Sequence, residues 1–434
     1  MNTLQPYSIT MAALAAAGEN HIPEELISST HLIYNSPAAL AFNSPGAQGF
    51  GVKRAGLAVP DSIMLLIGPG CCGRNTTILS EMGGYSERFF YYQMDDTDIV
   101  TGRHLTKIPR AIEEILQAVT KRPSVVMVCM TCVDALLGTD MERVCRKAAV
   151  KARLPVVPCY MYALTREGRN PPMADVRRAV YSLLEKQTRH RRTVNLIGFF
   201  APLQDDCELY EILHKMGITA IKELARCRSF EEYKTLSQAN FNIILHPEAR
   251  LAARDMQERL GIPAVELTRL YQVSKIHTQY QALGAVLGTT AEDGARWEQA
   301  RQAVAKMREK HAGTTVSIGE MQNGNAYEMA LALTQYGFVV KEIFANLSAQ
   351  DFVYVRHLAA VSPDTKVYSN LSPTMLYYED RDCPVDLTIG KDCAYYHPHA
   401  AHVYWDEDIQ PFGYAGVISL LQAVHTALTE RRNA

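Results

Sequence analysis

The sequence predicts an α/β protein built from three Rossmann-like domains, each a mostly parallel β-sheet flanked by helices. From residue 63 onward, short apolar runs rich in β-branched residues alternate with amphipathic segments. The apolar runs are continuous, as expected for strands that a parallel sheet buries on both faces. There are more of these runs than one doubly wound sheet of ordinary size holds, so the chain needs several sheets.

The expected elements follow this alternation along the chain. We predict strands at residues 63–67, 125–128, 156–160, 194–199, 241–245, 315–318, 338–343, 366–369 and 385–389, and helices at residues 205–216, 248–260, 295–310 and 416–430. Polar junctions at residues 188–192 and 289–293 then suggest the domain boundaries. We expect an N-terminal extension (1–35), a first domain (36–190), a middle domain (191–292) and a C-terminal domain (293–434).

Composition excludes several classes of protein. The chain has 434 residues, 47% of them hydrophobic and 21% charged, with a formal net charge of -2 and no basic block. It has no cationic N-terminal leader and no apolar stretch of about 18 residues. We therefore expect a cytoplasmic protein that binds neither nucleic acid nor a membrane. In that compartment the ten cysteines are buried hydrophobic residues, metal ligands or nucleophiles rather than disulfides.

Position along the predicted strands separates these roles. Open α/β sheets bind ligands beyond the carboxyl ends of their strands, so thiols and imidazoles just after a strand are candidate functional groups. Cys145, Cys207 and Cys227 lie in or beside predicted helices, where we expect packing roles. The residues that follow predicted strands are Cys71, Cys72, Cys132, His246, Cys393, His397, His399 and His402.

The stretch "LLIGPGCCGRNTT" at residues 65–77 allows three interpretations: a phosphate loop, a metal or redox site, or a tight turn with buried thiols. The residues do not fit a phosphate-binding loop. Its essential lysine is replaced by Arg74, the Mg²⁺-binding hydroxyl position is Asn75, and Pro69 removes a backbone N–H that such a loop needs.

A metal site needs thiolates that loops present, and iron–sulfur clusters usually take four. Cys71 and Cys72 are neighbours and would point in opposite directions in an extended turn, so both are not expected to face one metal. In "CMTC" we expect Cys129 to end a buried strand and Cys132 to lie in the loop beyond it. Cys72 and Cys132 would together supply half of a four-thiolate site.

A specific resemblance covers the chain from about residue 36 to its C-terminus. "GPGCCGRNT" resembles the G-P-x-G-C-G loop of the nitrogenase component 1 superfamily, and "VVMVCMTCVDALLGTDME" resembles its strand followed by T-[TE]-C-x-x-x-x-x-G-x-D. The likeness continues through "TVNLIGFF", "DDCELYEILHKMGI", "NIILHPEARLAARDMQERLGIPAVEL" and "PFGYAG". The resemblance implies the three-domain fold and makes the first domain a cluster-binding domain.

The resemblance also implies metal ligands. Cys72 and Cys132 match two of the three cysteines that hold a bridging P-cluster, or its simpler [4Fe-4S] counterpart, at a subunit interface. Gly70 and Gly73 would let the loop wrap the cluster closely, and Cys71 is an additional candidate ligand. We expect a [4Fe-4S] cluster, with a second cluster or an organic cofactor as a further candidate in an inter-domain cavity.

The sequence departs from the family at two sites. Residues 41–51, "AFNSPGAQGFG", carry no cysteine, and Asn43 or Ser44 would be poor ligands, so a second copy or another subunit would complete the cluster. The middle-domain cofactor cysteine is replaced at Leu245 and His246, which argues against an iron–molybdenum cofactor. We expect His246 and His402 to line a substrate pocket and to act as proton donors, and His246 has the alternative of capping the helix that follows.

The leading functional hypothesis is a subunit of a nitrogenase-like, ATP-dependent reductase. A separate homodimeric iron protein would supply electrons and hold the nucleotide, and a second component 1 subunit would complete a homodimer or heterotetramer. The alternative is a scaffold on which an iron–sulfur cofactor precursor is assembled without substrate turnover. A third hypothesis is a cluster-free binding module, in which both loop cysteines are ordinary buried thiols. The acidic residues of "QMDDTDIVTGR" are expected to bond loop amides.

Overall fold

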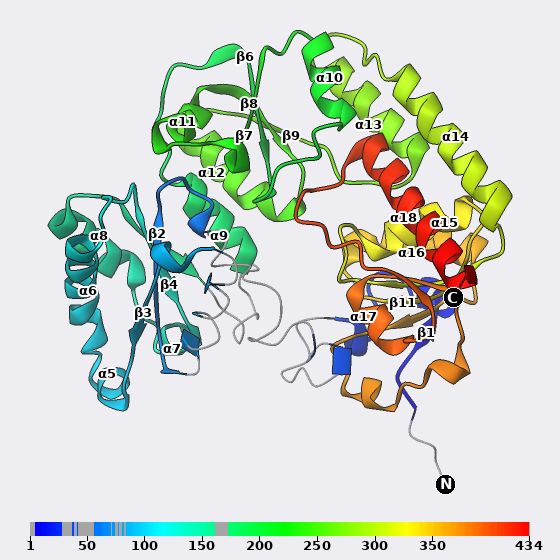
Figure 1. Ribbon diagram of the computed structural model, residues 1–434, viewed down its shortest axis with the longest axis horizontal. Coiled ribbons are helices and arrows are strands. Elements are labelled where there is room, and N and C mark those ends of the chain that lie inside the picture. The colour runs from blue at the N-terminus through cyan, green and yellow to red at the C-terminus, as the bar shows by residue number, and fades with distance from the viewer. Residues whose placement is uncertain are drawn as a thin grey trace. The chain divides into compact units, whose positions relative to one another are not determined.

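Three β-sheets with helices around them make up the molecule, as Figure 1 shows. The computed structural model describes residues 5–27, 37–38, 41, 56–70, 72–73, 77, 80–81, 84–160 and 172–433. Apart from one short antiparallel strand, all strand pairs in the three sheets are parallel. The predicted fold class, an α/β protein with mostly parallel sheets flanked by helices, is confirmed.

The first sheet has the order β3-β2-β4-β5. Its strands are β2 (Ile63–Gly68), β3 (Phe89–Gln93), β4 (Val126–Met130) and β5 (Val156–Tyr160). The helices that follow these strands are α5 (Asp96–Thr101), α6 (His104–Ala118), α7 (Cys132–Leu136), α8 (Met141–Ala152) and α9 (Pro172–Tyr181).

Both faces of this sheet are covered, which explains its continuous apolar strands. Side chains alternate across β2: Leu65 packs into one core with α6 and α8, and Leu66 packs into another with α9. All six residues of β2 are buried. The carboxyl ends of the strands are therefore the edge of the sheet where polar side chains can gather.

The second sheet repeats the strand order of the first, as β7-β6-β8-β9. Helices α9 and α12 pack against each other, and a single hydrophobic core takes in residues of both helices and of both sheets. The elements are β6 (His190–Ile197), β7 (Ala220–Glu223), β8 (Ala239–Ile244), β9 (Ala264–Glu266), α11 (Phe230–Lys234) and α12 (Arg250–Leu260).

The third sheet has six strands in the order β1-β12-β11-β10-β13-β14, with β1 antiparallel to β12. Its strands are β1 (Ile9–Thr10), β10 (Thr315–Gly319), β11 (Val339–Phe344), β12 (Lys366–Tyr368), β13 (Leu387–Ile389) and β14 (Ala401–Val403). The accompanying helices are α1 (Met11–Ala17), α10 (Glu208–Lys215), α13 (Val273–Val286), α14 (Gly294–His311), α15 (Ala326–Gln335), α16 (Phe352–Val361), α17 (Lys391–Tyr396) and α18 (Gly413–Asn433).

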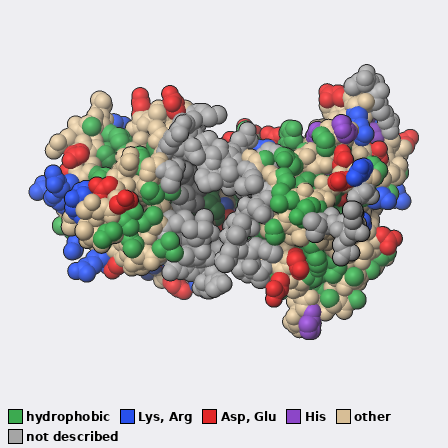
Figure 2. All heavy atoms as spheres, turned by 90° about the horizontal axis from the view of Figure 1, so that it is seen from below, with side chains coloured by type: hydrophobic (Ala, Val, Ile, Leu, Met, Phe, Trp, Pro, Cys, Tyr) green, Lys and Arg blue, Asp and Glu red, His purple; other side chains and the backbone are tan. Residues whose placement is uncertain are grey.

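The chain forms two compact units. Unit 1 comprises residues 1–47, 203–217 and 269–434 and contains the third sheet, and unit 2 comprises residues 48–202 and 218–268 and contains the first two sheets. The domain boundaries predicted from the sequence stay predictions. Acidic and basic side chains intermingle on the face shown in Figure 2. Within the described ranges, no helix combines the length and the apolar character that crossing a membrane requires.

Candidate functional site

The first sheet has a topological switch point between β2 and β4. The chain runs from β2 to β3 on one side and then crosses to β4 on the other, so the loops after β2 and β4 leave the sheet in opposite directions. In open α/β sheets this divergence opens the crevice where ligands bind. The Cys72 loop follows β2, and Cys132 comes two residues after the end of β4.

Gly68, the last residue of β2, lies where the two loops meet. A Cβ atom added to Gly68 would lie 2.6 Å from Cγ2 of Thr131 and 3.4 Å from Cβ of Cys72. Its carbonyl oxygen accepts hydrogen bonds from the Tyr91 hydroxyl and the Met94 N–H, each 2.9 Å long. The glycine thus permits a close approach that brings the starts of the Cys72 and Cys132 loops together.

The other two glycines of the loop differ in what they contact. A Cβ on Gly73 would lie inside the Tyr91 ring, 2.1 Å from Cζ, so this glycine makes room for that ring. A Cβ on Gly70 would make only an ordinary contact, 3.5 Å from Nε2 of Gln93. The N–H of Cys72 donates to the carbonyl of Pro69 (3.0 Å), which closes the turn.

The cysteines of this sheet fall into two groups. Cys72 is partly exposed, whereas Cys129, Cys145 and Cys159 are buried. Burial raises the pKa of the Cys145 thiol to about 12 and that of the Cys159 thiol well above its ordinary value, so both stay neutral packing residues. The packing roles predicted for Cys129 and Cys145 are confirmed.

Cys132 opens helix α7, which corrects our expectation that it lies in a loop. Its backbone alone is described, and Cys71, together with residues 42–51, lies outside the described residues. Among the described residues no group of three or more histidine, cysteine or carboxylate side chains is arranged to hold a metal ion. The described residues at the β2/β4 switch point fit a four-thiolate cluster as a half-site, because two described cysteine positions, Cys72 and Cys132, lie there.

A buried pair of side chains, His104 and Asp134, holds helix α7 against α6. His104 Nε2 lies 2.9 Å from Asp134 Oδ1, and both side chains are at most 1% exposed. His104 Nδ1 lies 3.0 Å from the carbonyl oxygen of Asp98, which can only accept, so Nδ1 carries a proton. Burial raises the pKa of Asp134 against the opposing effect of His104. The pair links α6 to the helix that Cys132 begins.

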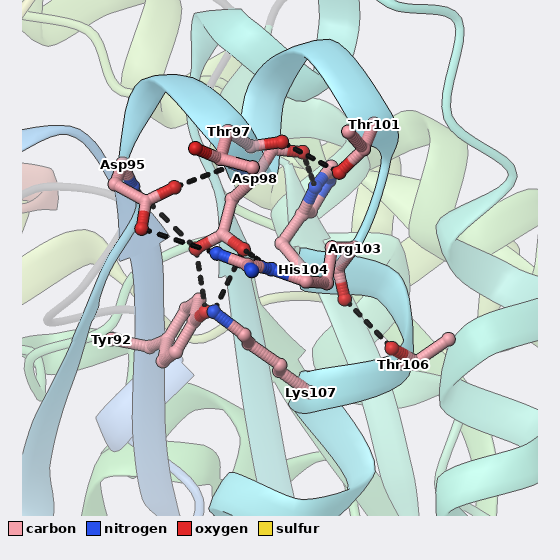
Figure 3. Close-up of polar contacts among 9 residues, drawn as sticks. All are labelled: Tyr92, Asp95, Thr97, Asp98, Thr101, Arg103, His104, Thr106 and Lys107. Carbon is pink, nitrogen blue, oxygen red and sulfur yellow. Dashed lines mark hydrogen bonds and ion pairs between the residues drawn. The ribbon is translucent and has the colours of Figure 1, made fainter.

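Asp98 links β3, α5 and the start of α6 through its polar contacts, as Figure 3 shows. Its carboxylate accepts from Tyr92, Arg103 and Lys107 at 2.8–2.9 Å, and it forms a reciprocal capping box with Asp95 at the start of α5. Burial raises the pKa of Asp98, but the bonds from Lys107 and Arg103 outweigh it and hold the pKa well below its usual range. Asp95 and Asp98 bond backbone amides, as predicted for residues 93–103, and Asp98 also pairs with two cationic side chains, which was not predicted.

The second sheet has its own switch point, between β6 and β8, and His246 lies there. Gly198 follows β6 with φ +129°, and a Cβ on it would lie 2.7 Å from the backbone N of His246. Nδ1 of His246 accepts the N–H of Glu248 (3.3 Å), which caps the 3-10 turn Pro247–Ala249. The capping alternative predicted for His246 is thus present. Because Nδ1 accepts, the neutral ring carries its proton on Nε2.

A salt bridge supports this histidine. Glu248 Oε2 lies 2.6 Å from Arg177 Nη1, and Arg177 Nε donates to the carbonyl of Gly198 (2.7 Å). The guanidinium lies 4.7 Å from the Phe200 ring centroid, and burial lowers its pKa against the field of Glu248. The side chain of His246 remains 38% exposed beside Phe199.

His402 lies inside the edge strand β14, not in the loop after β13. Its Nδ1 is 2.8 Å from the Thr388 hydroxyl, its ring stacks on Tyr404, and burial lowers its pKa. Cys393 is fully buried in α17, and its thiol donates to the carbonyls of Ile389 and Gly390. His246 belongs to unit 2 and His402 to unit 1.

The other two histidines of that segment differ from each other. His397 is buried, with Nε2 2.7 Å from Glu342 Oε2 and 3.0 Å from the Tyr378 hydroxyl, so it has a structural setting. His399 is exposed.

The third switch point, between β10 and β13, carries carboxylates that sequence reasoning missed. Asp392 Oδ2 accepts the N–H of Glu320 (2.9 Å), and Nδ2 of Asn370 bridges Asp392 and Glu320 at 2.6 and 3.2 Å. Burial, and then the charge of Asp392, raises the pKa of Glu320 to about 7. An acidic residue directly after a predicted strand was the available signal, at residue 320 after the strand expected at 315–318.

Comparison with known proteins identifies the family. The model of the family described as "Nitrogenase component 1 type Oxidoreductase" matches residues 47–429. The chain belongs to this family. The resemblance that the cysteine loops suggested is therefore confirmed.

Several curated relatives of this component 1 chain are named "Nitrogenase iron-molybdenum cofactor biosynthesis protein NifE". The Rhodobacter capsulatus protein is 25% identical over 359 residues, covering 77% of this chain and 73% of the relative. The Nostoc sp. protein is 28% identical over 238 residues, covering 53% and 49%. A "Nitrogenase molybdenum-iron protein alpha chain" from Methanosarcina barkeri is 26% identical, covering 47% and 40%. The chain thus spans about half the length of some of these relatives.

Solved structures agree on the fold. The structure titled "Nitrogenase Cp1 at pH 6.5" superposes with a TM-score of 0.72 over 94% of this chain and 96% of that one, at 17% identity. The structure titled "Nitrogenase Cp1 at pH 5" gives a TM-score of 0.67 at 14% identity. At such identities the similarity establishes the fold of this component 1 chain.

Proposed function

We propose that this chain is a scaffold subunit that holds an iron–sulfur cofactor precursor and passes it on, without turning over a small substrate. The observation that carries the proposal is the alignment of 77% of the chain with a relative named as a cofactor biosynthesis protein. The β2/β4 switch point supports it, since it places two cysteine positions on neighbouring strand ends. The chain supplies half of a thiolate set, as a subunit of a larger assembly would.

Cys72 and Cys132 would hold a [4Fe-4S] cluster at a subunit interface, and a second copy of this chain or a different component 1 subunit would supply the remaining thiolates. Cys71 is a further candidate ligand, with Gly70 and Gly73 in the same loop. The bound cluster would supply one-electron chemistry. The chain's own part is to present the thiols. The Gly68 contact fixes the segment after β2 that carries Cys72, and the His104–Asp134 pair fixes helix α7, which Cys132 begins.

His246 and His402 are proposed to act on the cargo or on protons near it. In neutral form, His246 carries its proton on Nε2 at the β6/β8 switch point, because its Nδ1 accepts the Glu248 N–H. The ring of His402 contacts the Thr388 hydroxyl through Nδ1 and also has a hydrogen bond to the backbone of Pro398. Either imidazole would hydrogen-bond a second cluster or an organic ligand, which at His402 would exchange the bond to Pro398.

The second candidate function is a nitrogenase-like reductase, favoured by the family description as an oxidoreductase and by the relative named as a molybdenum-iron protein alpha chain. In that case a separate homodimeric iron protein would bind ATP and deliver electrons. The same protein would be the partner of a scaffold whose precursor is reduced. The degenerate glycine loop of this chain, with Arg74 and Asn75 at the critical positions, agrees with a nucleotide site elsewhere.

Iron and acid-labile sulfide analysis after anaerobic purification tests the shared part of both functions. We expect about two irons and two sulfides per chain, since two chains share the four irons of one cluster. A folded protein with less than about one iron per chain would contradict cluster binding.

Mixing the loaded protein with its iron protein and ATP separates scaffold from reductase. A scaffold releases its cluster intact to an acceptor protein, and ATP hydrolysis does not depend on added substrate. ATP hydrolysis that rises with an added reducible substrate, while the cluster stays bound, would favour the reductase.

A further inference from the structure

One hydroxyl at the β2/β4 switch point has no hydrogen-bond partner in the part of the chain that the structure describes. The side chain of Thr131, between β4 and Cys132, is 1% exposed, and its Oγ1 has no hydrogen-bond partner among the described residues. Buried hydroxyls in native proteins are nearly always hydrogen-bonded, so this atom calls for an explanation. The hydroxyl belongs to the residue that precedes a candidate cluster ligand.

The side chain of Thr131 faces the place where the cysteine loops meet. Its Oγ1 lies 3.3 Å, and Cβ of Cys72 3.4 Å, from the position that a Cβ on Gly68 would take. The methyl Cγ2 packs closest to this position, at 2.6 Å. Threonine has few χ1 rotamers, and this contact with the end of β2 limits them further, so the hydroxyl keeps its direction.

The backbone carbonyl at the end of β2 is already used. The carbonyl oxygen of Gly68 accepts two hydrogen bonds, from the Tyr91 hydroxyl and the Met94 N–H, which takes up both of its lone pairs. The Thr131 hydroxyl therefore needs an acceptor that does not come from the end of β2. Thiolates and sulfides are such acceptors, because each carries negative charge.

We propose that Thr131 donates a hydrogen bond from Oγ1 to a sulfur atom of the group that Cys72 and Cys132 hold. This inference rests on the proposed cluster-holding function and adds to it a residue that tunes the cluster. A hydrogen bond to a cluster sulfur favours the reduced form, which is the more negative one, and so raises the reduction potential. Thr131 would thereby help to set whether the cluster is carried oxidised or reduced.

Three substitutions separate the hydroxyl from the methyl group. Thr131→Ser keeps the hydroxyl, Thr131→Val keeps the shape, and Thr131→Ala removes both. The anaerobically purified assembly of each variant is analysed for iron, and its midpoint potential is measured by EPR-monitored redox titration. If Thr131→Val does not fold, the serine and alanine variants, which differ by one hydroxyl, decide the question.

We expect wild type and Thr131→Ser to share one potential, with Thr131→Val and Thr131→Ala lower. A change of about tenfold in the ratio of reduced to oxidised cluster at a fixed solution potential corresponds to about 59 mV for one electron. Equal potentials in all four proteins at full iron content would overturn the donor role. A midpoint potential shared by wild type and Thr131→Val would also overturn the donor role, because these two proteins share the methyl group and not the hydroxyl.

The same measurement distinguishes failure of the inference from failure of the proposed function. Wild-type protein that is folded and holds less than about one iron per chain overturns cluster binding, and the donor role with it. Wild-type protein that holds iron, with potentials that do not depend on the hydroxyl, overturns the role of Thr131 alone.

Discussion

The two switch points of unit 2 share a construction and differ in chemistry. In each, a glycine ends or follows the first strand and is approached closely by the loop across the crevice: Gly68 by Thr131, and Gly198 by His246. At β6/β8 the polar groups bond one another, since His246 caps Glu248 and Glu248 pairs with Arg177. At β2/β4, in contrast, the buried Thr131 hydroxyl finds no partner within the described part of the chain.

This difference in hydrogen bonding predicts different roles for the two crevices. A crevice whose side chains satisfy one another keeps its shape without a ligand, and a crevice with an unpartnered donor beside an accessible thiol gains stability when a ligand arrives. We therefore expect changes at β2/β4 to alter cluster binding and changes at β6/β8 to alter stability. The predictions for the cysteines, the two glycines and His246 test this division.

The largest effect is expected from the cysteines. Cys72→Ala and Cys132→Ala should each lose the cluster's visible absorption and EPR signature, because a half-site with one thiolate left cannot hold four irons with its partner. Cys145→Ala is the matched control: its thiol is buried between α8 and the first sheet, so iron content should stay at the wild-type value. Equal loss in all three variants would show that the ligands are wrongly chosen.

Breaking the buried His104–Asp134 pair should have the next largest effect. His104→Leu leaves Asp134 buried without its partner, and breaking such a pair typically costs about 3–5 kcal/mol. Urea denaturation of the metal-free protein measures this cost. Lys121→Leu is the control, because the Lys121–Asp61 pair is exposed and should contribute at most about 1 kcal/mol. Similar losses in the two variants would contradict the role assigned to the His104–Asp134 pair.

The two glycines provide the most direct comparison of the switch points. Gly198→Ala places a Cβ 2.7 Å from a backbone nitrogen at φ +129°, and Gly68→Ala places one 2.6 Å from a side-chain methyl. Overpacking costs about 1–3 kcal/mol, and we expect the higher value at residue 198, where backbone must move. Iron content should fall only in Gly68→Ala. A fall of iron in Gly198→Ala at unchanged stability would reverse the comparison.

Some features of the fold and of the site could be predicted from the sequence, and others could not. All nine predicted strands are present, because continuous apolar runs report burial on both faces of a sheet. Strand β3, "FFYYQ", was missed because it is aromatic and half-buried at a sheet edge. The short strands β1, β7, β9 and β14 were missed as well. The prediction that Cys72 and His246 lie just beyond the carboxyl ends of strands is confirmed. The His104–Asp134 pair joins residues 30 apart in sequence, and no periodicity reports such a pairing.

The β10/β13 switch point adds a pH dependence of stability in unit 1. Burial raises the pKa of Glu320 to about 7, above its usual value near 4.5, so the folded protein binds a proton there that the unfolded chain releases. The free energy of unfolding of unit 1 should fall as pH rises from about 4.5 to 7, by up to about 1.4 kcal/mol per pH unit from this group.

Glu320→Gln should flatten that slope in denaturant titrations at several pH values. The control is Glu298→Gln on α14, where the carboxylate is exposed beside Arg301 and should leave the slope unchanged. An unchanged slope in Glu320→Gln would mean that Glu320 is ionised throughout this range.

The smallest effect is expected at His246. His246→Ala removes the acceptor for the Glu248 N–H and costs about 0.5–2 kcal/mol, the usual cost of losing a helix cap. His246→Asn is the matched variant, because asparagine also caps and should restore most of this stability. Iron bound through Cys72 and Cys132 should be the same in both variants. If His246→Ala lost iron while His246→Asn kept its stability but not its iron, the imidazole would be a ligand, and β6/β8 would be a binding crevice like β2/β4.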